Sequence, residues 1–218
     1  MPRAVRAVTF DFGQTLVALD PATLIERLGE LGIVVASEAP ILASLGAGFA
    51  ASDRIVSQRG ATAAWHAFMD VLLAAAGVAE ADRARAVPWL FEQQRVRNLW
   101  RRPVPGMIEL CRELGAAGIP IGLVTNSEGR AAELVAELGW TDALPVVADS
   151  GVLGFEKPAP EIFEWTAERL GVPLGETVHV GDSFPADVMG SIGVGMRAVW
   201  FAPEEGPPHS KVETIPDR

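Results

Sequence analysis

The second half of the chain alternates short apolar runs with helix-like segments, and this alternation restricts the fold more than any other feature. Strands are predicted at residues 119–124, 143–148, 177–180 and 197–201. Helices are predicted at residues 107–117, 128–138, 160–170 and 186–192, and a glycine follows each of them. Strands that alternate with helices are typical of a doubly wound parallel sheet. The pattern therefore predicts an α/β fold.

An apolar run near the amino terminus is expected to join the same sheet. Residues 4–10 are apolar except for Arg6 and Thr9, and the run ends in Asp11. Such a run predicts a strand that is buried on both faces. Asp11 would then lie at the carboxyl end of the strand, where open α/β sheets bind their ligands. Taken alone, the segment is equally compatible with a strand followed by a simple turn.

The region between this strand and the alternating half has a different character. It is rich in Ala, Leu, Glu, Arg and Gln, and helices are predicted at residues 21–29, 40–57, 62–76 and 81–99. We therefore predict a core of residues 1–16 plus 104–218 and a helical insertion of residues 17–103, hinged at residues 16–20 and 102–106. The tail from Pro203 is rich in Pro, Glu and Asp and is expected to lie loosely on the surface.

Composition limits the cellular context and the partners. The net charge of −10 argues against a nucleic-acid partner. The single cysteine, Cys111, excludes an intrachain disulfide and fits a reducing cytoplasm. No apolar run reaches the ~18 residues that a membrane span needs, and the amino terminus lacks a signal-peptide pattern. We expect a cytoplasmic protein without a membrane partner, and the sequence does not indicate its oligomeric state.

Polar residues follow three of the predicted strands and converge on one edge of the sheet. They are Asp11, the pair Thr125 and Asn126, and Asp182, and they are joined by Lys157, one of only two lysines in the chain. Carboxylate oxygens are ligands that Mg²⁺ prefers. A lysine and a hydroxyl can neutralise and orient an anion, and a carboxylate can attack phosphorus. The sequence therefore predicts a site for a phosphoryl group and a divalent cation.

At these residues the chain resembles the haloacid dehalogenase superfamily of hydrolases, of the type with a helical cap inserted after the first motif. The resemblance runs from Val5 to about Phe201. The four motifs stand here as Asp11-Phe12-Gly13-Gln14-Thr15, Val124-Thr125-Asn126-Ser127, Lys157-Pro158, and Gly181-Asp182-Ser183-Phe184-Pro185-Ala186-Asp187. The resemblance implies a three-layer, Rossmann-like parallel sheet with the first strand near its centre, and a helical cap whose closure would exclude water from the site.

The resemblance also implies a role for each motif residue and a Mg²⁺-dependent phosphatase acting on a small phosphorylated metabolite. Asp11 would be the nucleophile that forms an aspartyl-phosphate. Thr125, Asn126 and Lys157 would bind the phosphoryl group. The metal would be held by Asp11, the Gly13 carbonyl, Asp182 and Asp187, with Asp187 acting either near the metal or on Lys157, and Thr15 would stabilise the loop after the first strand.

One position departs from the family pattern and leaves alternatives open. Phosphatases of the family usually carry an aspartate at the position of Gly13, where it protonates the leaving group and later activates water, although some members carry glycine. A 2-haloacid dehalogenase is disfavoured because the metal-site acids Asp182 and Asp187 are retained. A phosphonate hydrolase of this family needs a cap lysine, and residues 1–156 contain none. A non-catalytic module that binds phosphorylated ligands is the third alternative.

Several other polar residues have a structural interpretation. His179 lies within an apolar strand and is expected to be a hydrogen-bonded core histidine. Asp20 is expected to cap the first helix, although it could replace the missing acid. Cys111 is expected to be buried and inert. His66 and Arg59 in the insertion are expected to pack or to be solvated, with substrate contact as the lesser alternative.

Overall fold

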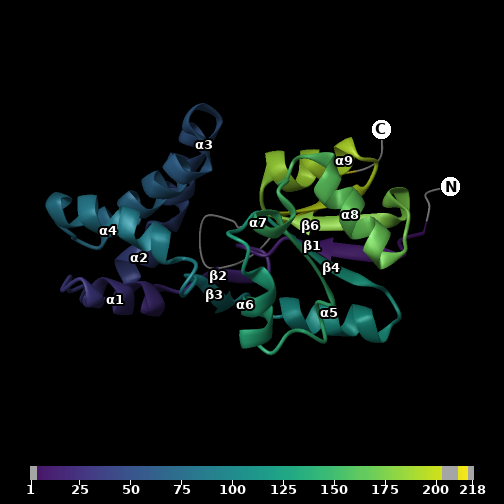
Figure 1. Ribbon diagram of the computed structural model, residues 1–218, viewed down its shortest axis with the longest axis horizontal. Helices are drawn as coiled ribbons and strands as arrows, with labels where there is room; N and C mark the ends of the chain where they lie inside the picture. Colours follow the sequence, from purple (N-terminus) through teal and green to yellow (C-terminus); the bar gives the residue numbers. More distant parts are fainter. Residues whose placement is uncertain (1–3, 203–210, 216–218) are drawn as a thin grey trace. The chain divides into compact units, whose positions relative to one another are not determined.

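The parallel sheet predicted from the alternating pattern is present in the computed structural model, which describes residues 4–202 and 211–215 (Figure 1). Its strands lie in the order β5-β4-β1-β6-β7-β8, so β1 lies inside the sheet with two strands on one side and three on the other. The strands are β1 (Ala7–Phe10), β4 (Ile121–Thr125), β5 (Val146–Asp149), β6 (Thr177–Gly181), β7 (Arg197–Ala202) and β8 (Lys211–Ile215). All neighbours pair in parallel except β7 and β8. The α/β fold class is confirmed.

Strand β8 corrects the expectation that the tail lies loosely on the surface. Residues 211–215 pair antiparallel with β7, with Ala198 opposite Ile215 and Ala202 opposite Lys211. Without β8, the outer edge of β7 would present unpaired N–H and C=O groups. The β-branched residues Val212, Thr214 and Ile215 favour an extended strand there. The remaining residues of the tail lie outside the described part of the chain.

Helices cover the two faces of the sheet and complete three layers, as Figure 1 shows. On one face, α5 (Met107–Ala116) and α6 (Ala131–Glu137) pack against Val8 and Phe10 of β1. On the other face, α8 (Pro160–Leu170) packs against Val124 of β4 and Ala148 of β5. The shorter elements of this unit are α7 (Ser150–Leu153), η1 (Leu174–Glu176), η2 (Phe184–Met189, a π-helical turn) and α9 (Gly190–Gly193). All four residues of β1 are buried, which confirms a strand covered on both faces.

Two short strands that the sequence did not predict lie where the helical insertion leaves and rejoins the core. Strand β2 (Val17–Leu19) pairs antiparallel with β3 (Trp100–Pro103). Three and four residues are too few to produce a recognisable period-2 pattern. Contacts divide the chain into one unit of Met1–Leu19 with Trp100–Arg218 and another of Asp20–Leu99. The second unit thus begins three residues after the predicted boundary of 17 and ends four residues before 103, because the flanking segments pair with each other.

The secondary structure described in the second unit is helical. It contains α1 (Pro21–Glu30), α2 (Ala39–Ala43), α3 (Leu45–Ala75) and α4 (Glu80–Gln93). The Asp20 side chain accepts from the Ala22 N–H at 3.2 Å and caps α1 as predicted. The helix predicted at residues 40–57 is divided between α2 and α3, and the one predicted at residues 62–76 lies in α3 beyond non-helical backbone at Gly60 (φ 80°, ψ 173°). The fourth helix ends earlier than predicted, since the Gln94 side chain turns back to accept from the Leu99 N–H at 3.1 Å.

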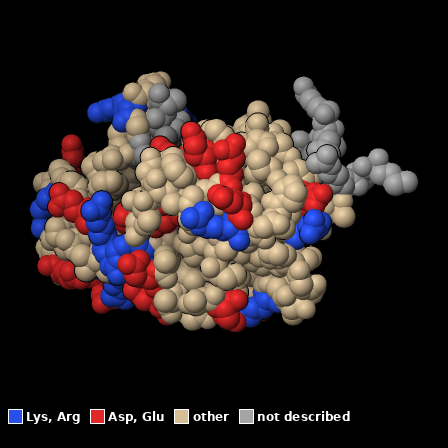
Figure 2. All heavy atoms as spheres, turned by 45° about the vertical axis from the view of Figure 1, so that its right-hand side comes forward, with Lys and Arg blue, Asp and Glu red and all other residues tan. Residues whose placement is uncertain are grey.

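The surface is mixed in charge. On the face drawn in Figure 2, acidic and basic side chains are interspersed between uncharged areas. This described surface does not offer the continuous basic stripe typical of nucleic-acid binding. Among the described residues, the helices are too short or too polar to cross a membrane.

Cys111 provides a test of the packing on the α5 face. Its side chain is fully buried in the cluster with Val8 and Leu123, and burial raises the pKa of the thiol to about 12. The thiolate is the reactive form. We expect no reaction with a disulfide reagent such as dithionitrobenzoate in the native protein and one thiol equivalent after unfolding in urea. Rapid stoichiometric labelling of the native protein would contradict this packing.

Candidate functional site

Residues at the carboxyl ends of four adjacent strands form the candidate site. Asp11 directly follows β1, and its backbone N–H donates to the Val180 carbonyl of β6 at 2.8 Å. Thr125 is the last residue of β4 and is buried, while Asp182 directly follows β6. These three predicted residues therefore share one edge of the sheet. Parallel strands produce this arrangement because all of them end at the same side.

The Lys157 ammonium is the centre of the site. Its Nζ atom lies 2.5 Å from Asp11 Oδ1 and 2.6 Å from Asp187 Oδ1. The Lys157 side chain is 3% exposed, and its partners are 10% and 1% exposed. Burial alone would lower the pKa of Lys157, but the charges of Asp11 and Asp187 outweigh it and hold the pKa above its usual range. The lysine is therefore a cation buried between two carboxylates.

Asn126 holds the segment that carries Lys157. Its Nδ2 group donates to the Lys157 carbonyl at 2.9 Å, and its Oδ1 atom accepts from the Lys157 N–H at 2.8 Å. Asn126 was expected to help bind a phosphate. In the structure both polar groups of its side chain are engaged by the backbone of Lys157, so its visible role is to fix the loop that ends in the lysine.

Asp149 is a further supporting residue, which sequence analysis missed. It is the last residue of β5, and its carboxylate accepts from the backbone N–H groups of Gly129, Ala131 and Gly151 at 3.1, 2.8 and 2.9 Å. These bonds hold the loop that follows Thr125. The available signal was the Asp-Ser-Gly sequence after a predicted strand, which is typical of a helix N-cap.

The loop after Asp11 is shaped by backbone hydrogen bonds. The N–H groups of Leu16 and Val17 both donate to the Phe12 carbonyl at 2.9 Å. Gln14 adopts left-handed backbone angles with φ 58°. The Thr15 hydroxyl, expected to stabilise this loop, is buried without a hydrogen-bond partner among the described residues.

Gly13 has backbone angles that other residues can adopt, since its φ is not in the left-handed region. A Cβ atom added there would lie 3.5 Å from Trp100 Cδ1 and 3.8 Å from Trp100 Nε1, which is ordinary contact. The indole of Trp100 on β3 therefore borders the position at which the sequence analysis noted a missing aspartate. Sequence analysis missed Trp100, because the pairing of β2 with β3 is what brings it to the loop.

Three carboxylates make up the candidate metal site. Oxygen atoms of Asp11, Asp182 and Asp187 lie within 4.8 Å of one another. Burial raises the pKa of Asp11 to about 6, with Lys157 opposing and Asp187 reinforcing the shift. Burial, Asp11 and Asp187 also raise the pKa of Asp182 well above its usual range. Acids whose ionisation is costly, with oxygen donors this close together, fit a bound divalent cation.

Asp187 differs from the other two acids in its surroundings. Its Oδ1 atom accepts from Lys157 Nζ and lies 3.1 Å from His179 Nε2, and its Oδ2 atom accepts from the Ser183 N–H at 2.9 Å. Burial would raise the pKa of Asp187, but the Lys157 charge and these hydrogen bonds hold it well below its usual range. Asp187 is thus a permanently ionised partner of Lys157. His179 was correctly expected to be a buried, hydrogen-bonded histidine, but its contact with a site residue was not foreseen.

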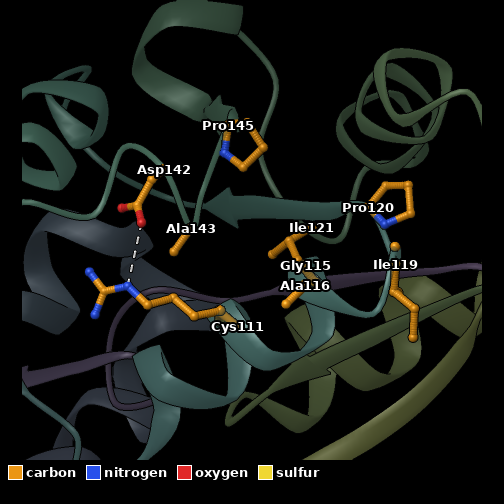
Figure 3. A pocket seen from close by; sticks show the side chains of 11 residues that line it. Cys111, Gly115, Ala116, Ile119, Pro120, Ile121, Asp142, Ala143 and Pro145 are labelled. Atoms are coloured by element: carbon orange, nitrogen blue, oxygen red, sulfur yellow. Dashed lines mark ion pairs between the residues drawn. The ribbon is translucent and has the colours of Figure 1, made fainter.

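The hollow drawn in Figure 3 lies near the amino ends of β4 and β5, away from the carboxyl ends that carry the candidate site. It is lined by Cys111 and Arg112 of α5, by the segment 118–121 that leads into β4, and by Asp142 and Ala143 ahead of β5. Its main polar feature is the ion pair between Arg112 Nε and Asp142 Oδ2 at 3.5 Å. It contains none of the predicted site residues, so we do not assign it to the chemistry.

The polar residues singled out in the helical unit have structural partners or open surroundings. The Asp20 carboxylate is occupied by the α1 cap, with Oδ2 accepting from the Thr23 hydroxyl at 2.6 Å. Arg59 is exposed, and with His66 it lines a hollow of about 440 Å³ between α3 and α4. His66 packs edge-on against Phe91 with ring centroids 5.3 Å apart.

Comparison with known proteins is consistent with this geometry. Solved structures of similar fold include the putative HAD-hydrolase YfnB from Bacillus subtilis bound to magnesium, with a TM-score of 0.69, 22% identity and coverage of 97% of this chain and 92% of that one. A HAD phosphatase from Thermococcus onnurineus has a TM-score of 0.58, with 26% identity over 94% of this chain and 90% of that one.

Curated relatives carry the names of phosphatases. Escherichia coli 5-amino-6-(5-phospho-D-ribitylamino)uracil phosphatase YigB is 40% identical over 40% of this chain and 35% of the relative. Ribulose-1,5-bisphosphate 5-phosphatase of Halopiger xanaduensis is 38% identical over 47% of this chain and 43% of the relative. The chain thus spans less than half the length of these two relatives. The profile of the haloacid dehalogenase-like hydrolases matches residues 5–195, and the chain therefore belongs to this family of hydrolases.

Proposed function

We propose that this hydrolase cleaves phosphate monoesters of small molecules, with Mg²⁺ as cofactor and Asp11 as nucleophile. The observation that carries the proposal is the buried Lys157 ammonium, 2.5 Å from Asp11 Oδ1 and 2.6 Å from Asp187 Oδ1. The lysine fixes one oxygen of Asp11, so the other carboxylate oxygen can serve as the attacking atom. The phosphatase names of the curated relatives support the substrate class.

The proposed reaction proceeds in two displacements at phosphorus. In the first, an Asp11 oxygen bonds to phosphorus while the bond to the ester oxygen breaks, and the departing oxygen takes a proton from water or from the substrate. In the second, water displaces the Asp11 carboxylate from the aspartyl-phosphate and releases inorganic phosphate. The Lys157 charge and the Thr125 hydroxyl would stabilise the negative charge on the phosphoryl oxygens in both steps.

We assign the cation to Asp11, Asp182 and the Gly13 carbonyl. Asp187 belongs to the same cluster, but its oxygens are already engaged by Lys157, His179 and the Ser183 N–H. We therefore assign Asp187 to the positioning of Lys157. When bound, Mg²⁺ would supply positive charge that neutralises the phosphoryl oxygens and the surrounding carboxylates.

The retained acids favour this function over a dehalogenase. A dehalogenase of this family works without a metal, so it has no use for Asp182, a second carboxylate close to Asp11 whose ionisation is costly. Gly13 is compatible with either chemistry. Dependence of the activity on a divalent cation separates the two functions.

The first test is the replacement of the nucleophile. We expect Asp11→Asn to remain folded and to lose phosphate release by a factor on the order of 10⁴ or more, because an amide cannot form the acyl-phosphate bond. Asp142→Asn makes the same substitution at an exposed carboxylate and should retain full activity. EDTA should abolish the activity of the parent, and Mg²⁺ should restore it. Halide release from a 2-haloacid that persists in EDTA would contradict the proposal.

The second test uses the ionisation of the acids to detect the cation without turnover. The raised pKa of Asp11 makes the stability of the folded protein depend on pH. The contribution of Asp11 is fully present below pH 3.8 and is lost as the pH rises through about 6. Mg²⁺ should relieve this cost only where Asp11 is ionised. We therefore expect Mg²⁺ to raise the melting temperature more at about pH 7.5 than at about pH 5. Asp182→Asn should reduce the rise, and an equal rise at both pH values would contradict the assignment.

The third test concerns the missing acid. Gly13→Asp can be accommodated, since the added Cβ meets Trp100 only at 3.5 Å. A positioned acid is worth ~10²–10⁴ in rate, so the variant should turn over alkyl phosphates faster by a factor in that range. Activated aryl phosphates need little protonation and should gain less. Gly13→Asn is the matched control without an acid. No gain in a folded Gly13→Asp variant would mean that another group already supplies the proton.

A further inference from the structure

His179 lies inside the sheet, where its imidazole has two polar partners. It is the direct register partner of Thr9 across β1 and β6. On the same face its ring packs edge-on against Phe163 of α8, with centroids 5.2 Å apart. Its Nδ1 atom lies 2.9 Å from the Thr9 hydroxyl, and its Nε2 atom lies 3.1 Å from Asp187 Oδ1. With 1% of its surface exposed, this histidine cannot reach substrate.

The partners determine where the imidazole proton lies. Ionised Asp187 can only accept, so the proton must be on Nε2, which donates to Oδ1. The Thr9 hydroxyl can then donate to Nδ1. His179 is therefore a fixed donor to the carboxylate that holds Lys157.

The carboxylate of Asp187 is held from several sides. The Ser183 N–H fixes Oδ2, and His179 and Lys157 share Oδ1. A Cβ atom at position 181 would overlap this carboxylate, so Gly181 provides the room that it occupies. Without the donor from His179, Oδ1 would have Lys157 as its one remaining hydrogen-bond donor among those described here. The carboxylate could then turn and draw the ammonium away from Asp11.

We propose that His179 is a positioning residue for the hydrolysis proposed above: its Nε2–H fixes Asp187 Oδ1 and thereby holds the Lys157 ammonium on Asp11. Thr9, His179, Asp187, Lys157 and Asp11 form one hydrogen-bonded chain from the interior of β1 to the nucleophile. This inference rests on the proposed function. The proposed role can be distinguished from a packing role, because packing needs the ring of His179 but not its Nε2–H group.

Two substitutions separate the donor from the ring. His179→Phe keeps an aromatic ring against Phe163 and removes the donor, and His179→Gln keeps an N–H donor at similar reach. Removing a residue that orients an active-site ligand typically costs 10–100-fold, and we expect this loss in kcat for His179→Phe. KM should change by less than about threefold, because His179 does not touch substrate. His179→Gln should recover part of kcat.

Thr177→Val is the matched control on the same strand. Thr177 is fully buried, and its hydroxyl donates to the Pro173 carbonyl at 3.1 Å without contacting Asp187. Its loss should leave kcat near that of the parent. Melting temperatures of all variants show whether each is folded. A folded His179→Phe with the kcat of the parent would overturn the proposal, and so would equal losses of kcat in the Phe and Gln variants.

Nuclear magnetic resonance provides a readout without turnover. Imidazole nitrogen signals of protein labelled with ¹⁵N-histidine report the protonation of each ring nitrogen. The chain has three histidines, so His179→Gln and His66→Gln variants assign the signals. We expect His179 to carry a proton on Nε2, and a ring whose single proton is on Nδ1 would overturn the proposal. A parent that hydrolyses no phosphate ester would contradict the proposed function itself, whereas an active parent with an unaffected His179→Phe variant would contradict this inference alone.

Discussion

The candidate site depends on one buried cation held between two carboxylates. Taking Lys157, Asp11 and Asp187 out of water is costly, and the cost is recovered only if the geometry of their contacts is good. The contacts of 2.5 and 2.6 Å from Nζ satisfy this condition. Removal of Lys157 would leave two buried carboxylates without their shared counter-charge. The surrounding structure is therefore required to hold each member in place, and most of the loops at this edge of the sheet do so.

Within this cluster the sheet positions Asp11, while Lys157 lies in the loop before α8 and Asp187 lies in η2. Asp11 and Asp182 directly follow β1 and β6, and Asn126, one residue beyond β4, fixes the backbone of Lys157 through two hydrogen bonds. Asp149 at the end of β5 holds the loop after Thr125 through the backbone N–H groups of Gly129 and Ala131. Asp11, Asn126 and Asp149, at or just beyond the ends of β1, β4 and β5, thus fix the lysine and a neighbouring loop. The rigid parallel sheet therefore holds these residues in fixed positions.

Much of the fold could be predicted from sequence because the signals are local and repeated. Short apolar runs, helix-ending glycines and the Asp20 cap are visible within a few residues, and the structure confirms the strands and helices that they indicate. Three strands could not be foreseen. Strands β2 and β3 are too short to show a period, and β8 lies in a polar tail and forms by pairing with the edge of β7. Pairing between distant segments leaves little trace in either segment alone.

The site was predicted at the level of its motif residues but not of their partners. Asp11 directly follows β1, Lys157 lies in the loop before α8 and Asp187 lies in η2, and the three meet at the carboxyl ends of the strands, as the pattern implies. Trp100 reaches Gly13 through the pairing of β2 with β3, and the neighbour of His179 in the register is Thr9. Both contacts depend on strand register, which motifs do not encode. A histidine within an apolar strand appears in sequence to be a packing residue. The structure places the same imidazole between the Thr9 hydroxyl and the Asp187 carboxylate. Strand register can therefore place polar side chains of the sheet interior directly behind residues of the candidate site.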